Sequence, residues 1–373
     1  MNAVDLTREL VSIPSHDDES EAAAYLADWF REQTDAEVTR DDHDNVFARE
    51  GPDDAPELAL VGHHDVVPPD DSQVEDGKYV LEERDGRLYG RGTADMKGAV
   101  AAAACAFRDC EVRRTSRSRT SSGDADLGCE LVFASFAGEE VGGVGCRAAI
   151  DEGFAPDYAV VGEGSTGYSA PGVTDVVVAH KGRRASTLVA RGTATHASTP
   201  EEGENAIYRA ADAVDVVRDL EAPETEVVGE SMRGSVVVTE IDGGDSWNTV
   251  PERCAVTVDE RTVPGERAAL ERATEVPGVD HRVDQDLPPM HCGDEAFART
   301  VREAAASAQS GDPELVTKPH ATDAGWLASR ADTDCVVVGA SEPGEAHTAT
   351  ESVSLAVVER CYEIYRAVAE TTT

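Results

Sequence analysis

Apolar positions in the first half of the chain follow two alternating patterns. Some segments repeat apolar residues every three or four positions, as in an amphipathic helix. Others are short, continuous apolar runs, which are typical of strands buried in a parallel sheet. The helical segments are 5–13, 19–33 and 93–109, and the strand segments are 57–67, 129–138 and 156–164. This alternation predicts an α/β layer fold.

The pattern changes near residue 175. Two strands around a turn are expected over 174–194, then a helix over 205–220, two alternating strands, and a second helical stretch near 265–275. The alternating strands are 234–244 and 253–263, and the later α/β elements are 295–308, 334–340 and 352–370. A chain of 373 residues is too long for one ordinary core. We therefore expect an α/β domain over 1–174 and 283–373, with a small α+β domain over 175–282 inserted in it.

The formal net charge of the chain is −41. Such a chain repels nucleic acid and anionic membranes, so neither is an expected partner. Lysine occurs only at positions 78, 97, 181 and 318. An acidic, lysine-poor surface indicates a protein that works in concentrated salt, where screening removes the self-repulsion. Most acids are therefore expected to serve solvation, and only those in apolar or glycine-rich settings are site candidates.

The sequence gives no indication of export or membrane insertion. No apolar run is long enough to span a bilayer, and the N-terminal segment lacks the apolar core of a secretion signal. The eight cysteines are scattered singly without a C-x-x-C pair, which fits a reducing cytoplasm. The segment 113–126 is low in complexity and locally basic, and we interpret it as a surface loop insertion.

Histidines and acids gather where buried strands end. GHHDVVP (62–68) places His63 and Asp65 on one side of a strand and His64 on the other, because side chains alternate along a strand. The other candidates lie in glycine-rich turns or loops: Asp95 in GRLYGRGTADMKG, Glu139 and Glu140 in AGEEVGGVG, Glu163 in VVGEGS, and His347 in GEAHTATES. The carboxyl ends of parallel strands meet at the sheet edge where α/β folds build sites. Two histidines and several carboxylates there match a pair of divalent ions that share a bridging carboxylate.

Each candidate also has a simpler interpretation. His63 could be a core histidine bonded to Asp65, and Asp95 could be only a helix N-cap. Glu139 and Glu140 could form a solvated turn in a chain this acidic. A phosphate loop is not expected, because the pattern G-x-x-x-x-G-K-[ST] is absent. We prefer the metal interpretation, because it explains why all these groups gather at one sheet edge.

The segments GHHDVVP, GRGTADMKG, AGEEVGG, VVGEG and AHTATE resemble those of metallopeptidase family 20 in order and spacing, over the whole chain. That family includes acetylornithine deacetylase, succinyl-diaminopimelate desuccinylase, aminoacylase and glutamate carboxypeptidase. The resemblance implies a di-metal aminopeptidase-like α/β catalytic domain with an inserted α+β dimerisation (lid) domain. The chain departs from the family at His64, where an uncharged residue is common, and strand alternation favours His63 over His64 as the ligand.

The resemblance also implies a role for each site residue. Five are implied metal ligands: His63 and Glu163 for the first ion, Glu140 and His347 for the second, and Asp95 as the bridge between them. Asp65 is implied to orient His63, and Glu139 to act as the general base. The implied cofactors are two divalent ions per subunit, with zinc as the first candidate and cobalt as the second.

In the inserted domain, GTATHASTPEEGENAI resembles the family's dimerisation segment. It implies a homodimer in which His196 reaches the partner subunit's site and polarises the scissile carbonyl. NTVPERC and DERTV resemble the segments whose Asn248 and Arg261 hold the substrate, Arg261 by its carboxylate. Simpler interpretations stay open for all three: a loop histidine, a turn residue and a surface ion-pair partner. Asp323 in ATDAG also falls in a family-like segment and receives no role.

The implied reaction is hydrolysis of an amide bond by a metal-activated water. The expected substrate is an N-acyl amino acid or a small peptide with a free carboxylate. The leading class is the N-acylated diamino acids of lysine or arginine biosynthesis, such as N-acetylornithine or N-succinyl-diaminopimelate, and the alternative is a dipeptidase or carboxypeptidase. An alternative of another class is a non-catalytic homologue that binds metal or ligand. The presence of every implied ligand and of the base argues against it.

Overall fold

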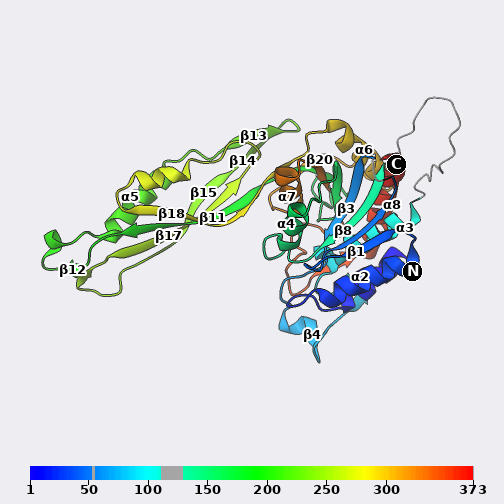
Figure 1. Ribbon diagram of the computed structural model, residues 1–373, viewed down its shortest axis with the longest axis horizontal. Coiled ribbons are helices and arrows are strands. Elements are labelled where there is room, and N and C mark those ends of the chain that lie inside the picture. Colours follow the sequence, from blue (N-terminus) through cyan, green and yellow to red (C-terminus); the bar gives the residue numbers. More distant parts are fainter. Residues whose placement is uncertain (53–54, 111–128, 373) are drawn as a thin grey trace. The chain divides into compact units, whose positions relative to one another are not determined.

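The computed structural model describes residues 1–52, 55–110 and 129–372, so the expected insertion at 113–126 lies outside the described residues. The chain divides into two compact units (Figure 1). Unit 1 comprises Met1–Ala179, His291–Lys318 and Thr322–Thr373, and unit 2 comprises His180–Met290 and Pro319–Ala321. The predicted fold class, an α/β domain with a smaller α+β insertion, is confirmed.

Unit 1 is built on a nine-stranded sheet. The order along the sheet is β1-β2-β8-β3-β9-β21-β10-β19, with β20 paired to β10. The neighbours β8, β3, β9 and β21 run parallel, whereas β1–β2, β2–β8 and β10–β21 pair antiparallel. The strands are β1 (Glu37–Arg40), β2 (Val46–Glu50), β3 (Glu57–His63), β8 (Glu130–Phe136), β9 (Tyr158–Val161), β10 (Val176–His180), β19 (Met290–His291), β20 (Leu315–Lys318) and β21 (Asp334–Val337).

The central strands are continuously apolar because helices cover both faces of the sheet. Every residue of β8 is buried. Figure 1 shows α4 and α7 on one side of the sheet and α3 and α8 on the other. The helices of unit 1 are α1 (Ala3–Ser12), α2 (Ser20–Gln33), α3 (Gly98–Asp109), α4 (Val144–Asp151), α6 (Glu295–Ser307), α7 (Asp323–Arg330) and α8 (Leu355–Thr372).

Unit 2 is a four-stranded antiparallel sheet with one helix on it. The strand order is β15-β17-β11-β18, and α5 (Ala206–Arg218) packs against one face. Alternate residues of β17, Cys254, Val256 and Val258, join that core. The sheet strands are β11 (Gly182–Arg191), β15 (Ser235–Gly243), β17 (Arg253–Thr262) and β18 (Val279–Leu287); the two-stranded ribbons pair β12 (Thr195–His196) with β16 (Thr249–Val250) and β13 (Glu224–Val227) with β14 (Glu230–Arg233).

The two strands expected around a turn over 174–194 do not pair with each other. β10 pairs with β21 in unit 1, whereas β11 pairs with β17 and β18 in unit 2. The first boundary between the units therefore lies between Ala179 and His180, because β10 completes the larger sheet.

The inserted domain was expected to end at residue 282, but unit 2 ends later. β18 runs over Val279–Leu287 and pairs with β11, so unit 2 continues to Met290. The stretch expected to be helical near 265–275 contains only the short 3-10 helix η4 (Leu270–Glu275). The sequence reasoning overlooked β18, although Val279, Val283 and Leu287 recur at even spacing along it.

Within the described ranges, no helix is both long and apolar enough to cross a bilayer. All eight cysteines lie in these ranges, all are buried, and none forms a disulfide.

Candidate metal centre

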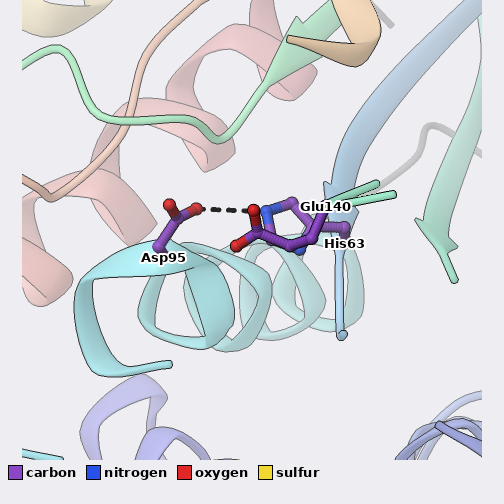
Figure 2. Close-up of side chains that lie close together, drawn as sticks. All are labelled: His63, Asp95 and Glu140. Atoms are coloured by element: carbon purple, nitrogen blue, oxygen red, sulfur yellow. Dashed lines mark hydrogen bonds and ion pairs between the residues drawn. The ribbon is translucent and has the colours of Figure 1, made fainter. Parts of the chain in front are cut away.

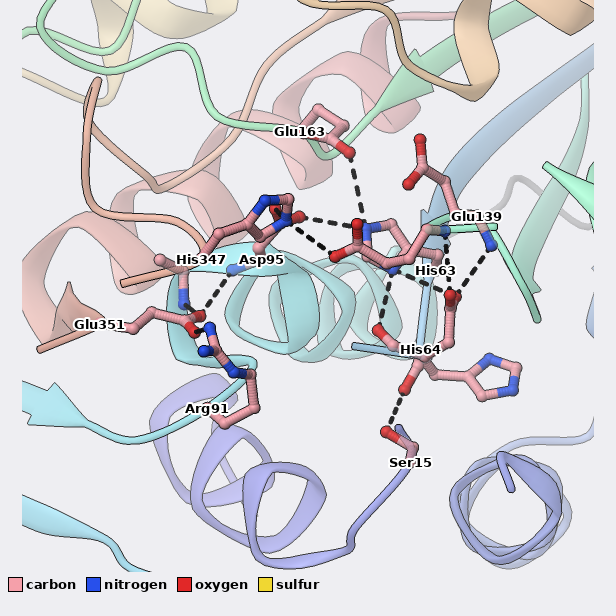
Figure 3. A network of polar contacts seen from close by, with 12 residues as sticks. Ser15, His63, His64, Arg91, Asp95, Glu139, Glu163, His347 and Glu351 are labelled. Carbon is pink, nitrogen blue, oxygen red and sulfur yellow. Dashed lines mark hydrogen bonds and ion pairs between the residues drawn. The ribbon is translucent and has the colours of Figure 1, made fainter. Parts of the chain in front are cut away.

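His63 is the last residue of β3, and its ring is buried at the carboxyl edge of the sheet of unit 1. Its Nδ1 lies 3.3 Å from Oδ1 of Asp65. The His64 ring points away from Asp95 and His347 (Figure 3), and its Nδ1 lies 2.9 Å from Oγ of Ser135. Burial lowers the pKa of His64 to about 3, so that ring is neutral. The ring of His63, and not that of His64, therefore faces Asp95.

Asp65 links His63 to the turn that follows β8. Its Oδ1 accepts the backbone N–H of Glu139 at 3.1 Å, and its Oδ2 accepts that of Glu140 at 3.0 Å. Burial alone would raise the pKa of Asp65, but the hydrogen bond and the charge of His63 hold this pKa below its ordinary value. Asp65 thus holds the imidazole through its carboxylate and its backbone carbonyl, which lies 3.0 Å from Nδ1 of His63, and its carboxylate also holds the backbone of both glutamates.

The glycines of AGEEVGGVG allow that turn to pack closely. Gly143 has a φ of 71°, and a Cβ there would lie 2.7 Å from Oδ1 of Asp323. A Cβ on Gly145 would lie 2.2 Å from Oδ1 of Asn45. The Glu140 side chain is only 12% exposed. The interpretation of these glutamates as a solvated turn is therefore wrong.

Asp95 lies between the two histidines. Its Oδ1 is 3.1 Å from Nε2 of His63 (Figure 2), and its Oδ2 is 3.0 Å from Nε2 of His347 (Figure 3). It belongs to the turn η2 (Thr93–Lys97) that precedes α3. Neither η2 nor α3 has a side-chain cap hydrogen bond among the described residues, so the N-cap interpretation of Asp95 is wrong.

Each imidazole also faces a glutamate. Nε2 of His63 lies 3.5 Å from Oε1 of Glu163, and Nε2 of His347 lies 2.9 Å from Oε1 of Glu140. The donors therefore fall into two groups that share Asp95. One group contains His63 and Glu163, and the other contains His347 and Glu140. The family resemblance implies the same grouping, and a donor atom of Glu140 also lies within 4.8 Å of those of His63 and Asp95 (Figure 2).

Glu139 lies beside the first group. Its carboxylate and donor atoms of His63 and Glu163 all lie within 4.8 Å of one another. It lines a small cavity with these two residues and Asp323. Burial raises the pKa of Glu139 well above its ordinary value; the charge of His63 opposes the shift, and the carboxylates of Asp323 and Glu163 add to it. A carboxyl group in this setting holds a proton more readily than an exposed one, which suits a group that accepts and returns a proton.

Asp323, to which the sequence reasoning gave no role, is buried at the start of α7. Neither carboxylate oxygen has a hydrogen-bond partner among the described residues. Burial raises its pKa to about 7. Asp323 is therefore a further acidic group in the lining of the small cavity beside Glu139.

Lys318 is a buried cation that the sequence reasoning missed. It is the last residue of β20, and its Nζ donates to Oε2 of Glu163 at 3.1 Å. Burial alone would lower the pKa of Lys318, but the carboxylate of Glu163 holds it above the ordinary value. No local signal marks this lysine, because its partner lies 155 positions earlier in the chain.

Glu351 and Arg91 form a second buried pair that was missed. Oε1 of Glu351 accepts the backbone N–H groups of Ala94 at 3.0 Å and Asp95 at 3.2 Å, and Oε2 pairs with Arg91 (Figure 3). Glu351 thereby ties the loop that carries His347 to the turn that carries Asp95. The sequence did contain a signal for Glu351, because this residue lies in the family-like segment AHTATE, four residues after His347.

The three substrate-binding candidates belong to unit 2, where they lie at two different ends. His196 is exposed on β12, and its neighbour Ala197 donates to the backbone carbonyl of Asn248 at 2.9 Å. Arg261 lies near the end of β17 and donates to Oδ1 of Asp259 at 2.8 Å. β17 starts at Arg253, and the eight residue-to-residue steps from there to Arg261 span roughly 26 Å. One chain therefore does not bring Arg261 together with His196 and Asn248.

The cluster in unit 1 contains more carboxyl groups than cationic side chains. Its carboxylates are Asp65, Asp95, Glu139, Glu140, Glu163 and Asp323, and the groups that face them are the imidazoles of His63 and His347 and the ammonium of Lys318. Crowded, buried carboxylates are unfavourable without compensating cations. Imidazole and carboxylate donors suit divalent ions such as zinc. The residues present therefore fit a pair of divalent metal ions.

Solved structures share this fold over the whole chain. Aminopeptidase PepT of Bacillus cereus is similar with a TM-score of 0.76 and 21% identity, over 100% of this chain and 98% of that one. An M20 family metallo-carboxypeptidase of Sulfolobus solfataricus is similar with a TM-score of 0.73 and 15% identity, over 99% of both chains. A dinuclear metal-binding peptidase of the M20 family from Bacillus subtilis is similar with a TM-score of 0.69 and 15% identity, over 99% and 96% of the two chains.

The family assignment rests on the sequence itself. The model of Peptidase family M20/M25/M40 matches residues 59–371. This range contains every residue of the cluster, from His63 to Glu351. The chain therefore belongs to Peptidase family M20/M25/M40, and it is a hydrolase of that family with a candidate site for two metal ions.

Proposed function

We propose that this protein hydrolyses the amide bond of a small N-acyl amino acid with the help of two divalent ions. The observation that carries the proposal is the position of Asp95, whose two oxygens face the two histidines at 3.1 and 3.0 Å. His63, Asp95 and Glu163 would hold one ion, and Glu140, Asp95 and His347 the other. Zinc is the first candidate and cobalt the second. When bound, such a pair of ions supplies a water that is nucleophilic near neutral pH and a Lewis acid for the carbonyl group.

Glu139 is the proposed proton carrier. It accepts a proton from the attacking water and returns it to the leaving amine nitrogen. Its high pKa, caused mainly by burial, suits both halves of that task. Asp65 supports it, because the carboxylate that orients His63 also accepts the backbone N–H of Glu139.

The substrate would be held by residues from two subunits. We assign Arg261 to the substrate carboxylate and Asn248 to a further polar contact, while His196 polarises the scissile carbonyl. Because His196 and Asn248 lie at the end of unit 2 opposite Arg261, the proposal assigns them to a second copy of the chain. The edge strand β15 supports a homodimer, since it exposes Val237 and Ile241 by 51% and 54%.

The leading substrates are N-acylated diamino acids, such as N-acetylornithine and N-succinyl-diaminopimelate, and a cytoplasmic location fits that role. The second candidate is a dipeptidase or carboxypeptidase. It is favoured by the similar solved structures, which include an aminopeptidase, a carboxypeptidase and a human carnosine dipeptidase. A non-catalytic homologue is the least favoured reading, because the base Glu139 is buried beside the ligands.

An amine-release assay tests the proposal. Purified protein in concentrated KCl would be given zinc or cobalt and a panel of N-acetylornithine, N-succinyl-diaminopimelate, N-acetyl amino acids and dipeptides. Each substrate would also be tested after removal of metal with a chelator. The proposal expects metal-dependent turnover of one acylated amino acid. Turnover of dipeptides alone would select the second candidate, and absence of turnover from protein that demonstrably holds metal would contradict both.

A further inference from the structure

The carboxylate of Glu163 is shared between the metal cluster and a lysine. Its Oε1 lies 3.5 Å from Nε2 of His63, whereas its Oε2 accepts a hydrogen bond from Nζ of Lys318 at 3.1 Å. The side chains of Lys318 and Glu163 are only 8% and 12% exposed. Because one oxygen is held by the ammonium, the carboxylate presents its other oxygen to the cluster.

The equivalent carboxylate of the other group has no such partner. Among the ion pairs of the described residues, Glu140 pairs with His347 and with no lysine or arginine. The two groups of ligands therefore differ by one buried positive charge, which lies beside Glu163 alone.

A cation beside a ligand has two opposed effects on metal binding. By holding the carboxylate in place it assists binding, and such orientation by a hydrogen-bond partner is worth about 10- to 100-fold in affinity. By withdrawing charge from the ligand and repelling a dication, it opposes binding. In a partly buried site, the repulsion between an ammonium and a dication a few ångströms apart exceeds the benefit of orientation. The net effect of Lys318 is therefore a weaker hold on the ion.

We propose that Lys318 is a fixed counterion of Glu163 that weakens binding of the ion held by His63, Asp95 and Glu163 more strongly than binding of the ion held by Glu140 and His347. The inference rests on the proposed two-ion function. It gives Lys318 a positioning role, because the lysine does not hold the ion itself but orients Glu163, while its charge opposes the ion. In the metal-free chain, the same lysine offsets part of the buried negative charge.

The test is a titration of metal-free protein with zinc against a chromophoric chelator, which resolves two dissociation constants. The variants are Lys318→Met, which keeps the length of the side chain without the charge, and Lys318→Arg, which keeps the charge. Lys78→Met, at an exposed lysine outside the cluster, is the matched control. We expect one constant of Lys318→Met to fall at least tenfold and the other to stay within threefold. Lys318→Arg and Lys78→Met should keep both constants within threefold of those of the unaltered protein.

The outcomes separate this inference from the function on which it rests. If the unaltered protein binds fewer than two ions, the two-ion function itself fails. If it binds two ions and Lys318→Met leaves both dissociation constants unchanged, or raises either of them, the proposed role of Lys318 is wrong. If Lys318→Met does not fold without metal, it would be purified with zinc, and loss of zinc to excess chelator would be followed. One ion should then leave at least tenfold more slowly than from the unaltered protein, and equal rates would overturn the inference.

Discussion

Single residues in this site serve several neighbours at once. Asp65 holds the ring of His63 and the backbone of both glutamates, and Asp95 faces both histidines. In such an arrangement, the chemical role of one residue can be separated from its structural role only by a substitution that preserves shape. Glu139 offers that opportunity, because among the described residues its side chain forms no hydrogen bond or ion pair that holds the cluster together.

We predict that Glu139→Gln lowers the rate of amide hydrolysis by about 10²- to 10⁴-fold, because an amide cannot accept the proton from water. Zinc binding should be unchanged, since Glu139 is not among the proposed ligands. The measurements are turnover on the best substrate and zinc stoichiometry of the same preparation. Glu82→Gln, at an exposed glutamate, is the control. Retained turnover in Glu139→Gln would remove this residue from the mechanism.

At the scale of elements, the site depends on loops that are tied to one another by buried ions. The loop before α8 carries His347 and Glu351, and Glu351 reaches the turn of Asp95 through two backbone hydrogen bonds. Arg91 completes this link with a side chain that is 3% exposed, while that of Glu351 is 0% exposed. Removal of one member of such a pair leaves an uncompensated buried charge.

We therefore predict that Glu351→Gln lowers the free energy of unfolding by about 3 kcal/mol, because Arg91 keeps its charge without a partner. Urea-induced unfolding at constant KCl and saturating zinc measures this. The control is again Glu82→Gln, which breaks the exposed pair with Arg84 and should change the free energy by less than about 0.5 kcal/mol. If Glu351→Gln loses no more than this control, the pair does not tie the two loops together.

The elements also show which parts of the structure local patterns could predict. β3 and β8 were predictable because continuous apolar runs mark strands covered on both faces. The histidine and acids at their ends followed, since parallel strands bring their carboxyl ends to one edge. Lys318 was not predictable, because β20 reaches the site only by pairing with β10. The turn over 174–194 was misread because periodicity shows that two strands exist but does not show which sheet each one joins.

At the scale of the molecule, the net charge of −41 is the dominant physical property. At low ionic strength these carboxylates repel one another, whereas in molar salt the screening length falls to about 3 Å. We predict a melting temperature roughly 10 °C higher in about 2 M KCl than in about 0.1 M KCl. Thermal unfolding followed by circular dichroism measures this in metal-loaded protein. Equal melting temperatures at the two concentrations would contradict the proposed adaptation to salt.

The proposed homodimer leads to a complementation experiment. Glu139→Gln lacks the base, and His196→Ala lacks the group proposed to act on the partner's substrate, so each variant alone should be nearly inactive. After subunits are mixed and exchanged, a mixed dimer contains one chain of each variant. The site of its His196→Ala chain keeps Glu139 and receives an intact His196 from the Glu139→Gln chain, so this one site is complete. Random exchange makes half of the dimers mixed, so activity should recover to about a quarter of that of the unaltered protein. No recovery, with exchange shown by mass spectrometry, would mean that His196 does not act across subunits.

The central claim is that the buried cluster of unit 1 holds two divalent ions, and counting bound metal tests it most directly. Metal-free protein would be dialysed against buffered zinc in concentrated KCl, and bound zinc per chain would be measured by mass spectrometry. The account predicts two ions in the unaltered protein and in the control His43→Ala, which changes an exposed histidine outside the cluster. It predicts one ion in His347→Ala, because His347 is a proposed ligand of the second ion alone. One ion or none in the unaltered protein, or two ions retained by His347→Ala, would contradict it.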